Sequence, residues 1–339
     1  MVTVLAPAGP TRSPWATRDP SRMTLLIGPV AALIAVAVAA VSGAASPSTD
    51  VPTWVLWVGL ACLAVGVPHG AVDHLTFLRP VEHQARAITL YVATAAAASA
   101  VILLAPGPSF IVVIAMSAWH FGSGDVESLA DLAHDLPDTR VWSALHKVAA
   151  GAVPLVLPLT GSATSATLEV IEPRLDHLAG LASGGVRLAT VAVALVVVVR
   201  LASTRRIRPA VELLVLVALG TWVSPLLAFG VYFAAWHSLR HTARLAQGTD
   251  GAVLARPLAR TFRAGLPALA LVVVVVAVAL LTAGGISSLG PWLWVTLAIV
   301  WGLTVPHMVV VARFDAAQRS ARLSSGATVA GRLTLFTNP

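Results

Sequence analysis

The chain has 339 residues, of which 57% are hydrophobic and only 11% are charged, and its mean hydropathy is +0.85. Soluble domains have roughly a quarter of their residues charged, so the composition excludes an ordinary soluble fold and predicts an all-α integral membrane protein. The net charge of +7 does not indicate nucleic-acid binding, because the arginines lie in short loops between apolar runs, where they set membrane orientation and meet anionic lipids.

Apolar runs long enough to cross a bilayer recur along the chain. About 20 apolar residues span the hydrocarbon core as a helix, and a helix satisfies its own backbone hydrogen bonds there. The pattern predicts one polytopic helical bundle of about ten transmembrane helices, within a range of eight to ten. In chain order the candidate spans are residues 23–45, 52–72, 87–105, 108–121, 146–160, 183–200, 209–226, 227–243, 265–284 and 291–312.

The basic residues predict the orientation of these spans. With the N-terminus in the cytoplasm, 20 of the 22 lysines and arginines lie on the cytoplasmic side, and only Arg174 and Arg187 lie outside. This asymmetry follows the positive-inside rule and places both termini in the cytoplasm. Residues 1–22 are then a disordered cytoplasmic N-terminus, residues 23–315 the membrane bundle and residues 316–339 a cytoplasmic tail.

Two segments fit this map less simply. The first apolar run follows three arginines and precedes SGAAS, as in a secretory signal. It is longer than the roughly 7–15 residues of a signal core, which favours a retained first helix. Residues 125–138 are expected to form an acidic cytoplasmic loop. The lone Cys62 excludes an intrachain disulfide.

Six of the ten histidines share one depth of the predicted bundle. They occur in the motifs GVPHGAVDH, SAWHFGSGD, AAWHSLRH and TVPHMVVVARFD, on the second, fourth, eighth and tenth spans. All four spans run from outside to inside, so these histidines lie toward the cytoplasmic side. The six are His69, His74, His120, His237, His241 and His307. Ionisable groups within membrane helices normally face the bundle interior and mark function.

The spacing of these histidines fits a metal site. His237 and His241 are four residues apart, so both rings project from one helix face. His69 and His120 complete a set of four imidazoles from two other helices. All-imidazole coordination suits iron, copper, zinc or nickel. The alternative for each histidine, a polar contact between helices, stays open.

Residues around the histidines predict how a site would be supported. Metal-bound histidines usually donate their second ring N–H to a carboxylate, carbonyl or water. Asp73 follows the second-span histidine by four residues, Asp125 follows the fourth-span histidine by five, and either fits this role. His74 and His307 remain candidates without an assigned role. Pro68 predicts a kink that frees backbone carbonyls next to a cavity.

The ordered motifs PHGAVDH, WHFGSGD, HSLRH and the late PH resemble the Brp/Blh family of bacterial membrane β-carotene 15,15′-dioxygenases, over roughly residues 50–315. The resemblance implies an enzyme of the bacterial inner membrane that uses Fe(II) and O₂. Its substrate would be β-carotene, split at the central double bond into two molecules of all-trans-retinal, often to supply a rhodopsin. The resemblance assigns the iron to His69, His120, His237 and His241, and establishes no ligand role for His307.

An apolar polyene predicts a hydrophobic tunnel that opens to lipid and passes the metal. Aromatic residues close to the histidine motifs are candidates for lining it: Trp119, Phe121, Tyr232, Phe233 and Trp236. Three other functions remain open. They are a membrane di-iron desaturase or hydroxylase, which needs more histidine clusters than this chain has, a haem-binding protein, and a transporter or proton relay with buried histidine and aspartate.

Overall fold

The structure is a computed structural model of the full chain, and every regular element among the described residues is helical, which confirms the all-α prediction. The described residues are 20–42, 52–71, 73, 83–133, 139–178, 184–246, 263–267, 269, 270, 273, 274, 277, 278, 281 and 289–335. The elements are α1 (Pro20–Val41), α2 (Thr53–Gly66), α3 (Pro68–Ala71), α4 (Gln84–Leu104), α5 (Pro106–Ala133), α6 (Arg140–Val156), η2 (Pro158–Thr160), α7 (Thr164–Ile171), η3 (Pro173–Leu178), α8 (Gly184–Ser203), α9 (Ile207–Trp222), α10 (Pro225–Val231), η4 (Tyr232–Ser238), α11 (Leu239–Ala246) and α13 (Leu289–Leu335).

Five helices in the described part of the chain are long and apolar enough to cross a membrane. They are Thr24–Val41, Gln84–Leu104, Pro106–Ala133, Gly184–Ser203 and Leu293–Ala317, and a shorter apolar helix covers Trp57–Gly70. The total of ten spans and the cytoplasmic termini stay predictions. Half of the predicted ninth span, 265–284, and most of the N-terminal segment 1–22 fall outside the described residues.

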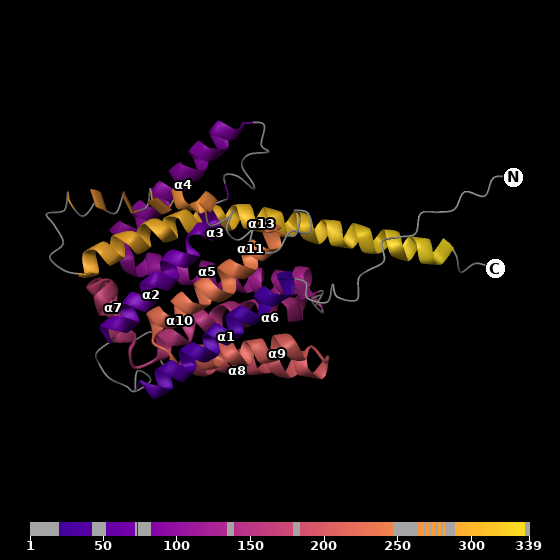
Figure 1. Ribbon diagram of the computed structural model, residues 1–339, viewed down its shortest axis with the longest axis horizontal. Coiled ribbons are helices and arrows are strands. Elements are labelled where there is room, and N and C mark those ends of the chain that lie inside the picture. Colours follow the sequence, from indigo (N-terminus) through magenta and orange to yellow (C-terminus); the bar gives the residue numbers. More distant parts are fainter. Residues whose placement is uncertain are drawn as a thin grey trace.

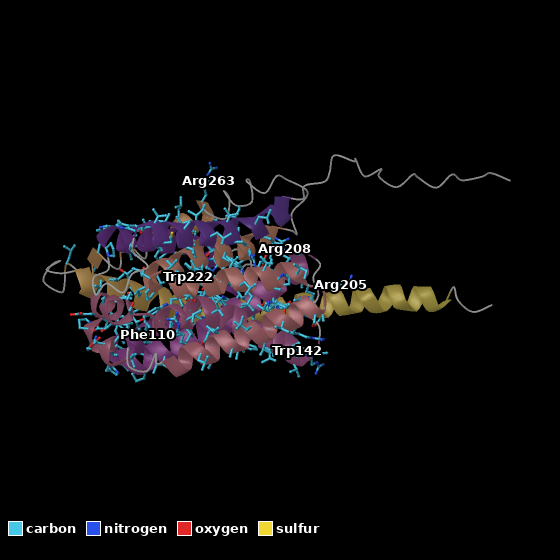
Figure 2. The ribbon with its side chains drawn as sticks, turned by 90° about the horizontal axis from the view of Figure 1, so that it is seen from below. Phe110, Trp142, Arg205, Arg208, Trp222 and Arg263 are labelled. Carbon is cyan, nitrogen blue, oxygen red and sulfur yellow. The ribbon has the colours of Figure 1, made fainter. Side chains whose placement is uncertain are left out.

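The helices lie side by side as a bundle, and α13 runs along it and continues beyond it (Figure 1). Figure 2 places Trp142, Arg205 and Arg208 at one end of the bundle and Phe110 toward the other. The start of α6 and the turn between α8 and α9 therefore share an end, where the Arg200 guanidinium lies 5.3 Å from the Trp142 ring centroid. The predicted orientation of the spans places both of these segments on the cytoplasmic side, so they are expected to share one end of the bundle.

Small residues allow the closest helix contacts. A Cβ atom built on Gly122 of α5 would lie 1.8 Å from the Lys147 carbonyl oxygen of α6, and one on Gly151 of α6 would lie 1.7 Å from the Ala118 carbonyl oxygen of α5. Neither position has space for a methyl group, so α5 and α6 pack backbone against backbone. This contact fixes the helix that carries His120.

The acidic loop predicted at residues 125–138 is wrong for residues 125–133, which continue α5 as a helix. Residues 134–138 lie outside the described residues. Charged groups remain inside because each has a partner: Glu127 accepts hydrogen bonds from Lys147 Nζ at 3.1 Å and from Arg319 Nη1 at 2.8 Å. Asp131 accepts one from Arg244 Nε at 2.9 Å. The sequence shows these charges but not the distant residues that pair with them, which is why it predicted a loop.

These groups belong to a set of charges that we call the ion-pair layer, which is buried at its centre and partly exposed at Arg208 and Arg319. Arg244 also donates to Asp315 at 2.7 Å, and Glu212 pairs with both Arg240 and Arg208 at 3.0 Å. The layer consists of Glu127, Asp131, Lys147, Arg208, Glu212, Arg240, Arg244, Asp315 and Arg319. It joins α5, α6, α9, α11 and α13 at the end of the bundle where the histidine motifs lie.

Candidate metal centre and substrate cavity

A break in the second predicted span positions His69. The α-helix ends at Gly66, and a new helical turn begins at Pro68, which has no N–H to donate to the preceding turn. His69 Nδ1 donates to the Gly66 carbonyl oxygen at 2.6 Å, and Ser238 Oγ lies 3.1 Å from the same nitrogen. With its proton on Nδ1, the ring leaves a lone pair on Nε2, the form that binds metals.

A widened helical turn carries His237. Residues Tyr232–Ser238 form a π-helix between α10 and α11, and π-helical turns frequently occur at functional sites. Ser238 Oγ donates to the Phe233 carbonyl oxygen at 2.6 Å, five residues back. The rings of His237 and His241 lie 6.2 Å apart between centroids, with 12° between their planes. Both therefore face the same side of this segment.

His120 reaches the same place from α5. Its ring centroid is 5.1 Å from that of His237. Gly124, one turn farther along α5, allows this approach, because a Cβ atom there would lie 3.2 Å from His237 Cε1. The ring of His69 also lies here, with its centroid 5.3 Å from that of His237 and 5.5 Å from that of His241.

His307 of α13 joins this group. Its ring centroid lies 5.2 Å from those of His69 and His120 and 5.6 Å from that of His241. The structure therefore brings together five imidazoles, where the family resemblance assigned four. We call His69, His120, His237, His241 and His307 the histidine cluster.

The chemistry of the histidine cluster fits a metal ion. All five rings are buried, and within the described structure each Nε2 atom has no hydrogen-bond partner. No three side chains among the described residues stand at the spacing of an assembled metal site. Nevertheless, metal–nitrogen distances of about 2.0–2.1 Å put imidazole centroids about 4.5–6.5 Å apart, and seven of the ten ring pairs in the cluster have centroids 5.1 to 6.2 Å apart. Five buried imidazole nitrogens without a partner among the described residues are the stronger indication.

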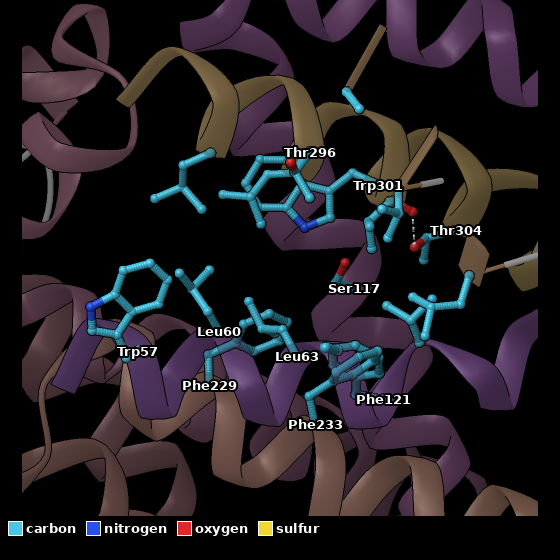
Figure 3. A pocket seen from close by; sticks show the side chains of 18 residues that line it. Trp57, Leu60, Leu63, Ser117, Phe121, Phe229, Phe233, Thr296, Trp301 and Thr304 are labelled. Carbon is cyan, nitrogen blue, oxygen red and sulfur yellow. Dashed lines mark hydrogen bonds between the residues drawn. The ribbon is translucent and has the colours of Figure 1, made fainter. Parts of the chain in front are cut away.

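An apolar cavity of about 430 Å³ lies within the bundle (Figure 3). It is lined by Trp57, Leu60, Leu63, Ala64, Val67, Ser117, Phe121, Phe229, Phe233, Leu269, Val273, Ala277, Leu293, Thr296, Leu297, Val300, Trp301 and Thr304. Its residues from Trp57 on α2 to Val67, which directly follows that helix, extend over about 15 Å at the rise of an α-helix. His69 lies two residues beyond this stretch, so the cluster stands at one end of the cavity.

Two phenylalanine rings form the boundary between the cavity and the cluster. Phe121 and Phe233 line the cavity, and Figure 3 shows them away from the end that Trp57 occupies. The Phe121 ring centroid is 4.3 Å from that of His237, and the Phe233 centroid is 5.3 Å from that of His69. The rings of Phe121 and Phe233 therefore lie between the histidine cluster and a molecule that fills the cavity.

A sequence profile described as Beta-carotene 15,15′-dioxygenase matches residues 60–315, a range that contains the whole histidine cluster. The chain belongs to this family. It is also 30% identical, over 350 aligned residues, to "Probable beta-carotene 15,15′-dioxygenase Blh" from Halobacterium salinarum, covering 89% of this chain and 95% of that relative. No solved structure matches the chain.

The surroundings of the dioxygenase-family histidines differ from the sequence predictions in two respects. Asp73 contacts His307, at 2.8 Å between Asp73 Oδ2 and the ring Nδ1, and His69 instead donates to a backbone carbonyl. Asp125 accepts a hydrogen bond from Tyr232 at 2.9 Å, and no hydrogen bond joins it to His120 in the described structure. His74 lies outside the described residues.

The predicted aromatic lining is partly observed. Phe121 and Phe233 line the cavity, but Tyr232 and Trp236 are fully buried against other helices and Trp119 is exposed. Sequence reasoning missed the cavity residues Trp57, Phe229 and Trp301, which lie away from the histidine motifs. It also missed Ser238, although this hydroxyl directly follows a histidine and lies next to a second one.

Proposed function

We propose that this member of the family is an iron-dependent dioxygenase that cleaves the central 15,15′ double bond of β-carotene. The products are two molecules of all-trans-retinal, and both oxygen atoms of O₂ end in the two aldehydes, so no outside reductant is required. The observation that carries the proposal is a cluster of buried, unpartnered imidazole nitrogens at the end of an apolar cavity. The family match and the name of the Halobacterium relative support the substrate.

The cavity lining suits a hydrocarbon substrate. Most of its residues are aliphatic or aromatic, with Ser117, Thr296 and Thr304 as the hydroxyl-bearing exceptions. Thr304 Oγ1 donates to the Val300 carbonyl oxygen of its own helix at 2.8 Å, so it offers the cavity little polarity. β-Carotene has no polar group, so it can fill this cavity without leaving any polar atom of its own unpaired.

The histidines and phenylalanines have separate tasks in this proposal. His69, His120, His237 and His241 would hold Fe(II) through Nε2, with His69 oriented by the Gly66 carbonyl. Bound iron supplies the activation of O₂ that side chains alone cannot provide. Phe121 and Phe233 lie against the polyene path, where they position the substrate beside the cluster and keep water out.

The membrane is the source of the substrate in this proposal. β-Carotene dissolves in the hydrocarbon core, and the exposed apolar faces of α1, α4 and α8 place the protein in the same layer. We infer a multi-pass protein of the bacterial inner membrane that takes its substrate from lipid and releases retinal there. A rhodopsin that binds retinal is the partner this product would serve.

The geometry disfavours the alternative functions. A haem needs a flat space between two axial histidines, whereas rings in this cluster lie as little as 5.1 Å apart. A di-iron desaturase or hydroxylase needs histidines for two metals, and one group of five is observed. A transporter or proton relay needs polar residues across the membrane depth, but the cavity toward the Trp57 end is apolar.

Expression in a β-carotene-accumulating bacterium tests the proposed function. The expected result is bleaching of the cells with formation of all-trans-retinal, identified by chromatography, and no change in a matched strain that expresses the His120→Ala variant. Purified protein should contain iron and should form two retinals per β-carotene consumed. Folded protein that binds iron but leaves β-carotene intact would show that the substrate is wrong. Shorter or unequal aldehydes would show that the cleavage position is wrong.

A further inference from the structure

His307 is placed like the four histidines that the family resemblance assigns to iron. Its side chain is 5% exposed, and its ring lies next to those of His69, His120 and His241. Its Nε2 atom is buried and has no hydrogen-bond partner within the described structure, which is also true of the other four. A histidine that served only to link helices would be expected to use this nitrogen in a hydrogen bond.

The opposite nitrogen of His307 is held firmly. Asp73 Oδ2 lies 2.8 Å from His307 Nδ1 and also accepts a hydrogen bond from the Tyr91 hydroxyl at 2.9 Å. Asp73 is itself buried. The carboxylate favours the tautomer with the ring proton on Nδ1, which leaves the lone pair on the buried Nε2. Carboxylate–histidine pairs of this kind orient metal ligands and increase their basicity.

Close packing leaves the His307 ring little freedom. A Cβ atom on Gly70 would lie 3.4 Å from His307 Nδ1, so the turn that carries His69 also lies against the His307 ring. Tyr91 on α4 completes the enclosure, and its hydroxyl lies 3.5 Å from the Leu303 carbonyl oxygen of α13. Three segments distant in sequence thus converge to orient a single imidazole.

We propose that His307 is a fifth imidazole ligand of the metal, and that Asp73 and Tyr91 are positioning residues that orient it. The identity of the metal as iron rests on the proposed function, but the number of ligands can be tested with any metal the site accepts. A fifth imidazole leaves one position fewer for O₂ and water than the four-histidine set does. The late PH motif is then part of the metal site.

Cobalt(II) substitution of the purified full-length protein measures the ligand set directly, because its visible absorption depends on coordination number and ligand type. The His307→Gly variant should change the position and intensity of these bands and bind cobalt at least about tenfold more weakly. Added imidazole should restore the parent bands, because it can enter the space left by the missing ring. A purely structural role for His307 predicts no such restoration.

Asp73→Asn provides the companion variant, since it nearly conserves shape and therefore folding. It should weaken cobalt binding by about 10–100-fold while keeping the band pattern of the parent. Tyr91→Phe should act in the same direction but less strongly. His177→Ala is the matched control, because it removes an exposed histidine outside the cluster. It should leave the cobalt spectrum and the cobalt affinity unchanged.

Two results would overturn the ligand assignment. One is a parent-like cobalt spectrum and affinity in both His307→Gly and His307→Gln. The other is an altered spectrum that imidazole does not restore in folded His307→Gly protein. Retinal formation tests the proposed function and not the ligand assignment. A parent protein that binds cobalt through five imidazoles but never cleaves β-carotene would contradict the proposed function alone.

Discussion

The imidazole rings of His237 and His241 lie nearly parallel across the junction of η4 and α11, 6.2 Å apart between centroids. Both contact the ring of His69, which stands almost perpendicular to them at 86° and 80°. The pair therefore forms one wall of the histidine cluster. This arrangement makes the pair the most constrained part of the proposed metal site.

Replacing either ring should remove the metal. We expect His237→Ala and His241→Ala each to abolish iron binding, because each variant deletes one donor and leaves an opening in the cluster. Metal analysis of the purified protein measures the effect, with His177→Ala as the control for loss of a histidine elsewhere. Stoichiometric iron in either cluster variant would contradict the ligand assignment.

The contact between α5 and α6 should be intolerant of any side chain. Gly122→Ala would place a methyl group 1.8 Å from the Lys147 carbonyl oxygen, so the helices must separate and His120 must move. We expect a loss of stability of about 1–3 kcal/mol, seen as a lower midpoint of thermal unfolding in detergent, together with weaker iron binding.

Gly184→Ala is the control for this effect of a methyl group. A Cβ atom at Gly184 meets nothing within 4 Å, so the variant should unfold at the temperature of the parent or slightly above it. Equal unfolding temperatures for Gly122→Ala and the parent would show that α5 and α6 are farther apart than the structure places them.

Filling the cavity should stop the reaction without disturbing the metal. Leu63 lines the cavity one turn before the break at Gly66, and a tryptophan there occupies space that the polyene needs. Leu63→Trp should lower retinal formation roughly tenfold or more while iron content stays that of the parent. Leu195→Trp, on the exposed face of α8, adds the same bulk elsewhere and should leave both measurements unchanged. Parent-like turnover in Leu63→Trp would place the substrate outside this cavity.

The sequence predicted the all-α class and most helices because apolar runs of sufficient length have few alternatives in lipid. It also predicted that His69, His120, His237 and His241 gather, since spans of equal direction bring their inner ends to one depth. What a one-dimensional pattern cannot supply is rotation about each helix axis. The inward direction of His307 depends on Asp73, which is 234 residues away.

Long-range partners explain the other differences. Residues 125–133 have the composition of a loop, but Lys147 and Arg319 approach Glu127 from two other helices and make burial of its charge tolerable. The four-residue spacing of His237 and His241 predicts a regular α-helix, whereas the structure has a π-helical segment there. Local spacing gives no information about the Ser238 hydroxyl contacts that accompany this wider turn.

The buried centre of the ion-pair layer should contribute much more to stability than an exposed ion pair elsewhere in the chain. Arg244 is almost fully buried and pairs with Asp131 and Asp315. Arg244→Ala would remove the cation that pairs with Asp131 and with the buried Asp315, and loss of one partner of a buried pair costs about 3–5 kcal/mol. We therefore expect a large fall in the thermal unfolding midpoint in detergent, and partial recovery when Asp131→Asn and Asp315→Asn are added.

Arg174→Ala is the matched control, because it removes an arginine whose side chain is 57% exposed and whose partner is Glu172. Hydrogen bonds from Arg174 hold the pKa of Glu172 below its ordinary value. The stability from this pair is therefore present at neutral pH and is lost as the pH falls through the lowered pKa. Exposed pairs contribute little, so Arg174→Ala should shift the unfolding midpoint only slightly at neutral pH. Equal shifts in Arg174→Ala and Arg244→Ala would show that the layer is not buried as the structure describes.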